Sequence, residues 1–473
     1  MSIKRYIANK DTTITNAYKI NNVSRAIESN MGASDILEVF SIYGQITTSS
    51  LEKSRILIQF PSNDILTDRN NKLIGQSGSV EFILKLSNAN QPDSAPDNLN
   101  LVVSPLSKSW QEGIGLDMEG YNDNGYANWV SASNSQAWTT EGGDIISSES
   151  IQKTLDLSTD DLELDVTEIV EKWLDGTLAN NGLLINLTSS QEDSTESFYT
   201  KKFFARRSQF FFKRPWIEAR TTDFIKDKRN NFYSSSPLVE ESENLNTLFI
   251  YNRVRGNLKN IPTVGTGTLL VKLYSGSATS GPLGVPQVLQ GGVTQVTGGF
   301  YSTGIYTASV GITSSLQYLY DVWCLPNNTE LITGSVINVF QHSSSFDIHT
   351  ENYVLAMPEL KNKYLYNENV RMRVYSYNKE WDSNIYTVSS RDNPVEVIEN
   401  LYYKITRIAD DYTVVNYGTG SYQHTLCSYD QISNYFDLSM DLFERGYSYR
   451  IEFLNKDTEK FSEFKESFKF RVE

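Results

Sequence analysis

The most ligand-like stretch of the sequence is residues 117–125, which reads DMEGYNDNG. Ca²⁺ takes about six to eight hard oxygen donors, and carboxylate and amide oxygens in a Gly-containing loop suit it. The spacing is not that of an EF-hand, and Asp, Asn and Gly in short succession also form ordinary turns. Asp117, Glu119 and Asp123 are therefore candidate calcium ligands, and a plain loop is the alternative.

A second acidic group has the residue types of a glycosidase pair, in which two carboxylates flank the scissile bond. Its members are Asp160, Asp161, Glu163 and Asp165. They stand beside the start of a predicted helix, where capping and the helix dipole already account for acidic side chains. We therefore predict no glycan-degrading pair at this place.

Histidine and cysteine are too few for the common catalytic and zinc-binding arrangements. The chain holds three histidines and two cysteines, namely His342, His349, His424, Cys324 and Cys427. Neither a zinc site nor a catalytic triad or Cys–His pair is expected from so few residues. The two cysteines are expected to be reduced packing residues. We predict a protein that is not an enzyme and has no catalytic or cofactor-binding residues.

The charge balance bears on the class of partner. The 42 basic and 57 acidic residues give a formal charge of −15, whereas nucleic acids and anionic membranes require a basic surface. Basic residues alternate with phenylalanines over residues 203–214, a pattern found in nucleic-acid grooves and at protein–protein interfaces alike. The acidic charge favours a protein interface. Because the apolar runs are far shorter than the roughly 20 residues of a membrane span, no membrane partner is expected.

The elements that must position these residues are almost all strands. Short runs rich in β-branched and aromatic residues alternate with Gly, Asn, Ser and Asp. The clearest predicted strands are 55–60, 80–86, 99–103, 183–187, 198–204, 269–274, 305–310, 316–323, 370–377 and 447–453. In Tyr447–Phe453 every second residue is apolar, which is typical of a strand with one buried face. The pattern predicts an all-β protein composed of several β-sandwiches.

One short amphipathic helix is predicted over Val166–Leu174. Asp165 before it can accept hydrogen bonds from the first free backbone N–H groups, and Glu168 follows three residues later, as in a capping box. Gly176 is a stop signal. A helix of this kind would close one end of a sandwich core.

Length and composition predict three domains. The 473 residues correspond to about three domains at roughly 150 residues each. Residues 223–246 are charged, Ser-rich and weakly periodic, as expected of a linker that a protease cuts first. A softer boundary lies near His342–Asn352. The predicted divisions are 1–222, 223–350 with a linker and a β-sandwich, and 351–473.

Residues 1–222 contain a series of short motifs in a distinctive order. They are DTTITN (11–16), NMGA (30–33), RILIQF (55–60), WQEG (110–113), Trp129, Trp138 with GGD (142–144), the 165–173 helix and NGLLI (181–185). Their order resembles that of the DNRLRE domain, a jelly-roll-like sandwich related to a carbohydrate-binding module. The resemblance implies that Trp110, Trp129 and Trp138 could form an aromatic platform for a sugar ring. Tryptophan more often fills a core or an interface, and that alternative stands beside the platform.

Further distinctive stretches follow along the chain. They are FFFKRP (210–215), NFYSSS (231–236), NLNTLFIYN (244–252), GYSY (446–449) and FKFRV (468–472). These stretches resemble large structural proteins of tailed-bacteriophage virions, particularly marine T4-like ones. The resemblance implies a virion component made in the host cytoplasm.

Residues 443–449, FERGYSY, are similar to the tyrosine-corner pattern of immunoglobulin-like and fibronectin-type sandwiches. Phe443 replaces the usual Leu and Arg445 the usual Pro. Gly446 allows a sharp turn, and the hydroxyl of Tyr449 is expected to bond back to the backbone of its own domain.

These observations lead to an expected function. We expect a non-enzymatic virion structural protein that assembles with other virion proteins and further copies of itself through its β-domain surfaces. A host adhesin that binds a glycan is the alternative, and a glycan-degrading enzyme is a weaker one.

Overall fold

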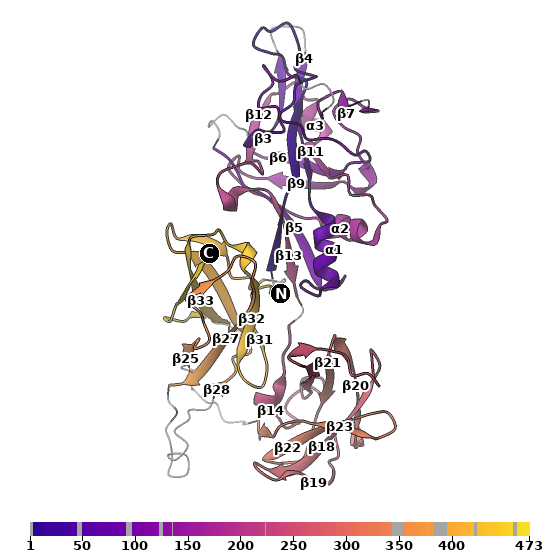
Figure 1. Ribbon diagram of the computed structural model, residues 1–473, viewed down its shortest axis with the longest axis vertical. Coiled ribbons are helices and arrows are strands. Elements are labelled where there is room, and N and C mark those ends of the chain that lie inside the picture. Colours follow the sequence, from indigo (N-terminus) through magenta and orange to yellow (C-terminus); the bar gives the residue numbers. More distant parts are fainter. Residues whose placement is uncertain are drawn as a thin grey trace.

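The computed structural model describes residues 3–44, 50–90, 97–122, 126–134, 136–222, 224–342, 353–379, 381, 395–420, 423–456 and 461–473. These residues form an all-β protein, and every sheet takes its strands from within 3–221, 232–340 or 353–472. The third domain lies beside the segment that joins the other two (Figure 1). None of the helices in the described part of the chain is long and apolar enough to cross a membrane.

The first domain has two main sheets. Its elements are β1 (Ile3–Ile7), β2 (Lys10–Thr15), β3 (Ile36–Gly44), β4 (Ser50–Gln59), α1 (Ser62–Asn70), β5 (Val80–Leu86), β6 (Leu99–Pro105), β7 (Ser131–Ser133), β8 (Gln136–Ala137), β9 (Ile151–Leu155), β10 (Leu162–Asp165), α2 (Thr167–Asp175), β11 (Leu183–Leu187), α3 (Ser189–Glu192), β12 (Phe198–Phe204) and β13 (Trp216–Thr221). One sheet has the order β1-β13-β5-β10. The other has the order β12-β3-β4-β11-β6-β9, and β2 also pairs with β4.

Two hydrophobic clusters fill this domain. The larger contains Ile58 of β4, Phe82 of β5 and Ile217 of β13, all fully buried, and so lies between the two sheets. Leu57 of β4 and Leu184 of β11 belong to a second, smaller cluster. Because successive side chains of a strand point to opposite faces, the larger sheet is covered on both faces.

Helix α2 lies at the larger core, shifted by one residue from its predicted bounds. Asp165 Oδ1 accepts a hydrogen bond from the backbone N–H of Thr167 at 2.9 Å, and Gly176 ends the helix in the left-handed conformation at φ 82°. The second bond of the predicted capping box is not formed, since Glu168 makes no bond to Asp165 among the described residues. Asp165 is the last residue of β10 and pairs there with Ile83.

The second domain is one curled sheet, whereas the sequence predicts a sandwich. Its strands are β14 (Phe232–Tyr233), β15 (Asn246–Tyr251), β16 (Arg253–Val254), β17 (Asn257–Leu258), β18 (Leu269–Ser277), β19 (Gly281–Pro286), β20 (Val296–Ser302), β21 (Ile305–Val310), β22 (Tyr318–Cys324), β23 (Glu330–Thr333) and β24 (Ile337–Phe340). Nine of them form a continuous sheet, and β16 pairs with β17 alone. β18 pairs with β22 along one edge and with β20 and β19 along the other. The nine strands therefore belong to one sheet.

The third domain is a sandwich of two sheets. Its strands are β25 (Tyr353–Ala356), β26 (Lys363–Tyr364), β27 (Asn369–Asn378), β28 (Val395–Glu396), β29 (Leu401–Arg407), β30 (Tyr412–Val415), β31 (Ser428–Tyr429), β32 (Asn434–Ser439), β33 (Ser448–Lys456), β34 (Phe461–Glu463) and β35 (Phe468–Val472). One sheet runs β25-β27-β32-β31 and includes β28. The other runs β26-β35-β33-β29-β30 and includes β34. Side chains of both sheets fill a single core.

Tyr449 lies in this core at the start of β33. Its side chain is fully buried, and its hydroxyl donates to the backbone carbonyl of Glu444 at 2.8 Å. Gly446 takes a φ of 86°, which glycine adopts without steric cost. The Tyr449 hydrogen bond is the one that the tyrosine-corner pattern predicts.

Replacing Tyr449 by phenylalanine is expected to lower the free energy of unfolding of the third domain by about 1–2 kcal/mol, since the carbonyl of Glu444 loses its donor. Urea denaturation of the full chain measures this difference. Tyr447, which is 37% exposed, provides the control, and Tyr447→Phe should change little. Equal stability of Tyr449→Phe and the unmodified chain would contradict a stabilising corner.

The first part of the predicted linker over 223–246 is packed against the third domain and is not lightly held. Tyr429 of β31 donates its N–H to the carbonyl of Ile225 at 2.9 Å, and Asp227 donates its N–H to the carbonyl of Tyr429 at 3.1 Å. Asp227 and Arg229 are both buried. Polar residues of 225–231 that suggested a solvated linker are instead bonded to the second and third domains, whereas residues 240–243 are exposed. Asp223 and residues 343–352 of the second predicted boundary lie outside the described residues.

These contacts change the expected pattern of limited proteolysis. Trypsin should cut slowly after Lys226, Lys228 and Arg229, because this backbone is held by hydrogen bonds. It should cut faster after Arg253 or Arg255, which are exposed at the β16–β17 turn. Mass spectrometry of the early fragments distinguishes the two, and early cleavage at 226–229 would show that the segment is loosely held.

Candidate functional site

The predicted sugar platform is wrong. Trp110, Trp129 and Trp138 are 3%, 4% and 6% exposed, within the smaller hydrophobic cluster of the first domain. The indole N–H of Trp110 donates to the carbonyl of Asn181, and that of Trp138 to the carbonyl of Asn128, both at 2.9 Å. The rings cover the outer face of the larger sheet, so none offers a free face to a sugar.

The candidate calcium ligands act as turn acceptors. Asp117 Oδ1 accepts from the backbone N–H groups of Glu119 and Gly120, both at 2.8 Å. Glu119 Oε1 accepts from the N–H of Ile20 at 2.6 Å. Asp123 lies outside the described residues. Within the part of the chain that the structure describes, no three His, Cys, Asp or Glu side chains are grouped to hold a metal.

The other residue types considered for chemistry also have ordinary structural partners. Lys85 lies 2.8 Å from Glu163 and 3.6 Å from Asp161, so these carboxylates do not face an open cleft as an unpaired couple. Cys324 and Cys427 are free and buried in different domains. They are the reduced packing residues that the sequence predicts.

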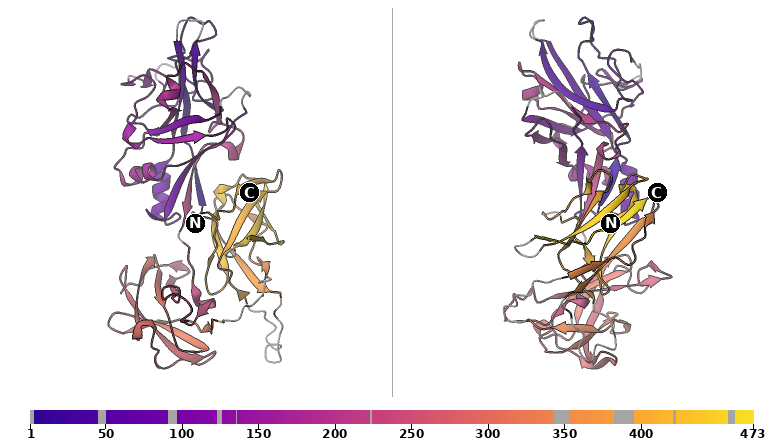
Figure 2. Two further views of the ribbon diagram at one scale, coloured as in Figure 1. Left: turned by 180° about the vertical axis from the view of Figure 1, so that it is seen from behind. Right: turned by 90° about the vertical axis from the view of Figure 1, so that its left-hand side faces the viewer.

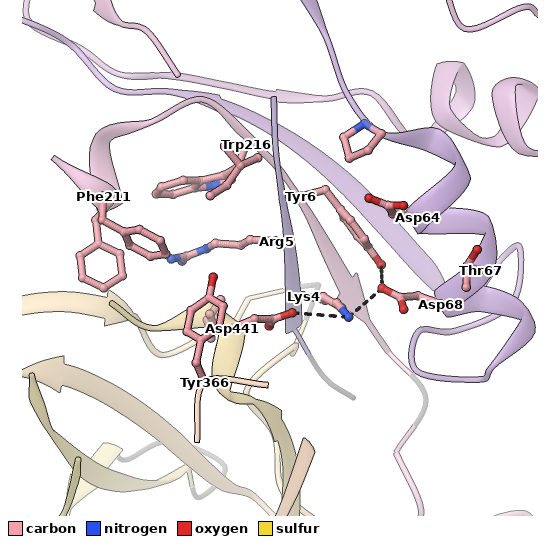
Figure 3. A pocket seen from close by; sticks show the side chains of 14 residues that line it. Lys4, Arg5, Tyr6, Asp64, Thr67, Asp68, Phe211, Trp216, Tyr366 and Asp441 are labelled. Atoms are coloured by element: carbon pink, nitrogen blue, oxygen red, sulfur yellow. Dashed lines mark hydrogen bonds and ion pairs between the residues drawn. The ribbon is translucent and has the colours of Figure 1, made fainter. Parts of the chain in front are cut away.

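The structure assembles a polar site that no sequence motif indicates, at the junction of the first and third domains (Figure 3). Strand β1 builds it by alternation. Tyr6 belongs to the core of the first domain, whereas Ile3 is 1% exposed and belongs to the core cluster of the third. β1 is therefore a strand of one domain that also packs into another.

Lys4 makes one ion pair within the first domain and one with the third domain. Its ammonium lies 2.7 Å from Asp68 Oδ2 of α1 and 3.6 Å from Asp441 Oδ2, which follows β32 in the third domain. The hydroxyl of Tyr6 donates to the same Asp68 oxygen at 2.9 Å. Burial and the nearby Asp68 raise the pKa of Tyr6, so its phenol stays a hydrogen-bond donor.

Arg5 makes a second connection beside the first. Its Nε donates to Glu218 Oε2 of β13 at 2.7 Å, and one terminal nitrogen donates to the carbonyl of Val414 in β30 at 2.6 Å. Its guanidinium lies 4.3 Å from the centre of the Trp216 ring. Burial alone would raise the pKa of Glu218, but Arg5 and Arg220 outweigh it and hold that pKa at about 2.

A cavity of about 430 Å³ remains between these groups, lined by the ion pairs and by aromatic rings such as Phe211, Trp216 and Tyr366. Phe212 belongs to the core cluster of the third domain and stacks on Tyr412 with ring centres 5.2 Å apart. Phe211 and Phe212 of the basic–aromatic stretch thus face the chain's own third domain, whereas Phe203 belongs to the core of the first. The polar groups that line the cavity bind one another. This arrangement suits a contact that stabilises two domains against each other.

The pKa of Glu218 predicts how the junction responds to acid. Because the folded-state pKa is about 2 and an unperturbed Glu titrates near pH ~4.3, the contribution to stability is complete above about pH 4.3. It is lost as the pH falls toward 2. Thermal unfolding between pH 5 and pH 2.5, roughly this window, should show a steeper loss for the unmodified chain than for Glu218→Gln. Parallel losses would contradict this role.

The second and third domains meet at a second buried charged cluster. Arg229 donates to both carboxylate oxygens of Asp321 in β22, each at 2.6 Å, and to the carbonyl of Phe249 at 2.9 Å. The indole N–H of Trp323 donates to Asp321 at 2.5 Å. Burial raises the pKa of neighbouring Asp227 to about 7. The backbone N–H of Asp227 also donates to β31 of the third domain. The cluster therefore lies where the chain, after running along the edge of the third domain, enters the second domain.

Both junctions escaped prediction because their partners are far apart in the sequence, as Arg5 and Val414 are. The available signal was weak, since the alternation in β1 resembles that of any half-buried strand. In comparisons with known proteins, no family model matches the chain, and no curated protein matches it.

Proposed function

We propose that the chain is a non-enzymatic structural protein of a tailed-bacteriophage virion, placed on the head, neck, tail or baseplate. The observation that carries this proposal is the pair of domain junctions. At each junction, buried charged side chains are paired within their own domain. The contacts that reach the third domain include the ion pair of Lys4 with Asp441 and hydrogen bonds with backbone groups.

The shape supports the same proposal. Along the longest axis the third domain lies between the first and the second (Figures 1 and 2), although it comes last in the sequence. It is in contact with both, through Ile3 and Phe212 of the first domain and through the 225–231 segment. A long body held in this way presents a large surface, and permanent assemblies bury more than about 2,000 Å². Its partners would be other virion proteins and further copies of itself.

The resemblance of residues 1–222 to the DNRLRE domain adds to the proposal. A jelly-roll-like first domain with one amphipathic helix at its core is compatible with the two sheets and α2. The glycan-binding alternative is weakened, because the tryptophans assigned to it are buried. We therefore place host recognition outside the proposed role of this chain.

Particle composition tests the proposal. Phage particles that encode this chain are purified, washed in high salt and analysed by mass spectrometry, with known capsid and tail proteins as internal standards. The proposal predicts that the chain stays with the particles in constant ratio to those standards. Its loss from washed particles, with abundant chain in the infected-cell lysate, would overturn the proposal and favour a soluble enzyme or binding protein.

A further inference from the structure

One sequence tract of the second domain has a composition unlike the rest of the chain. Residues 273–320 contain no Asp, Glu, Lys, Arg or His, although charged residues make up 21% of the sequence. Within this tract, four large apolar side chains are between 45% and 74% exposed. They are Leu283, Val285, Val288 and Val293, and we call the surface that they form the uncharged face.

The uncharged face is an edge of the curled sheet. Leu283 and Val285 lie on β19, which pairs with β18 and with no other strand in the described part of the chain. Residues 282–285 of β19 are all exposed. The backbone N–H of Leu289 donates to the carbonyl of Val293 at 2.7 Å. Because Val288 precedes Leu289, this bond keeps Val288 and Val293 near each other. β19 lies at the end of the molecule away from the first domain (Figure 1).

Two features limit what can bind there. Pro282 and Pro286 have no backbone N–H groups to donate to a further strand. Pairing of another strand with this edge is therefore disfavoured. The acidic loop at 240–243 borders the face, since Gln290 donates to the carbonyl of Glu241 at 3.0 Å. A partner would therefore meet apolar side chains on a strand edge without extending the sheet.

The charge distribution indicates which partner fits. Residues 1–222 hold 20 basic and 29 acidic residues, and residues 343–473 hold 15 and 21. Residues 224–342 hold 7 basic and 6 acidic residues, so the second domain alone is free of net negative charge. Two copies that met through the first or third domains would bring like charges together, which costs free energy. The uncharged face avoids most of this cost, since its acidic neighbours are those of the loop at 240–243.

We propose that the uncharged face docks onto the same face of a second copy of the chain. The contact is isologous, because each copy offers the same patch, with the four apolar side chains at its centre and Ser, Thr, Gln and Gly residues around them. This inference rests on the proposed structural function and names one contact between copies. It places the paired second domains at the middle of a longer, two-fold assembly.

Sedimentation velocity of the purified full chain over a concentration series tests this contact. The unmodified chain should self-associate, and added salt should strengthen the association by screening the acidic domains. Val285→Asp should raise the dissociation constant by about tenfold or more, which corresponds to about 1.4 kcal/mol. The matched control is Val23→Asp in the first domain, where Val23 is 83% exposed, and it should leave the association unchanged.

Three results would overturn the inference. They are a monomer at every concentration, equal association of Val285→Asp and the unmodified chain, and association that salt abolishes, which would mean that charged groups hold the copies. Circular dichroism confirms that both variants are folded. Because sedimentation uses the isolated chain, this inference can fail while the chain is still found in washed particles.

Discussion

Replacing Asp321 by asparagine is expected to destabilise the second domain by about 3–5 kcal/mol. The carboxylate accepts from two guanidinium nitrogens of Arg229 and from Trp323, and its side chain is fully buried. Removing its charge leaves the guanidinium, whose side chain is 5% exposed, without its main counter-ion. Asp227 Oδ2 lies 3.4 Å from Arg229 Nε, but burial raises the pKa of Asp227 to about 7, so it compensates the lost charge only in part.

Urea denaturation monitored by tryptophan fluorescence measures this loss, since Trp323 lies within the cluster. Asp411→Asn is the matched control, because Asp411 pairs with Arg450 while its side chain is 76% exposed. Such surface pairs contribute only about 0–1 kcal/mol. A similar small effect for both variants would contradict a central role for the buried pair.

Ile3→Asp is expected to separate the first and third domains. Burying one isoleucine stabilises the folded state by about 1.5–3 kcal/mol. An unpaired carboxylate buried in its place would carry a large desolvation cost. Because Ile3 sits in the third domain's core cluster while its own strand belongs to the first domain, the chain can avoid that cost by opening the junction. Small-angle X-ray scattering should show a larger radius of gyration, with the β-rich circular dichroism spectrum retained.

Ile20→Asp, at a position 83% exposed in the same domain, is the control and should leave the radius of gyration unchanged. Ile3→Val should also leave it unchanged, because valine keeps most of the apolar contact. An Ile3→Asp variant as compact as the unmodified chain would show that the β1 contact does not hold the domains together.

The local sequence pattern was sufficient to predict the position of most strands. β5, β11, β12 and β21 have the predicted bounds, and the other predicted strands differ from the observed ones mainly at their ends. Period-2 alternation and turn residues are properties of short segments, so they can be read without knowing the rest of the fold. The same holds for Tyr449, whose hydrogen bond closes over five residues of chain.

Features that depend on distant partners could not be predicted in this way. Helix α1 has little amphipathic pattern in its sequence SNDILTDRN and is joined to α2 by the ion pair of Arg69 with Glu171, at 2.6 Å. The linker prediction failed for a related reason. Composition describes Asp227 and Arg229 as solvated charges, and only the fold brings them to Asp321 and to β31.

The candidate sites also differ in whether a local pattern could predict them. Tryptophan suits a sugar platform and a buried cluster equally well by residue type, and Trp110, Trp129 and Trp138 adopt the second arrangement. The junction around Lys4 and Arg5 carries no motif, since its cross-domain contacts, with Asp441 and with the carbonyl of Val414, join opposite ends of the sequence.

The most direct test of the account is a reconstruction of the phage particle by electron cryomicroscopy. The account predicts copies of the three-domain body at fixed, symmetry-related positions, with the third domain between the other two and with neighbouring proteins packed against its surfaces. A well-resolved particle in which every density is explained by other proteins would contradict a structural role in the virion.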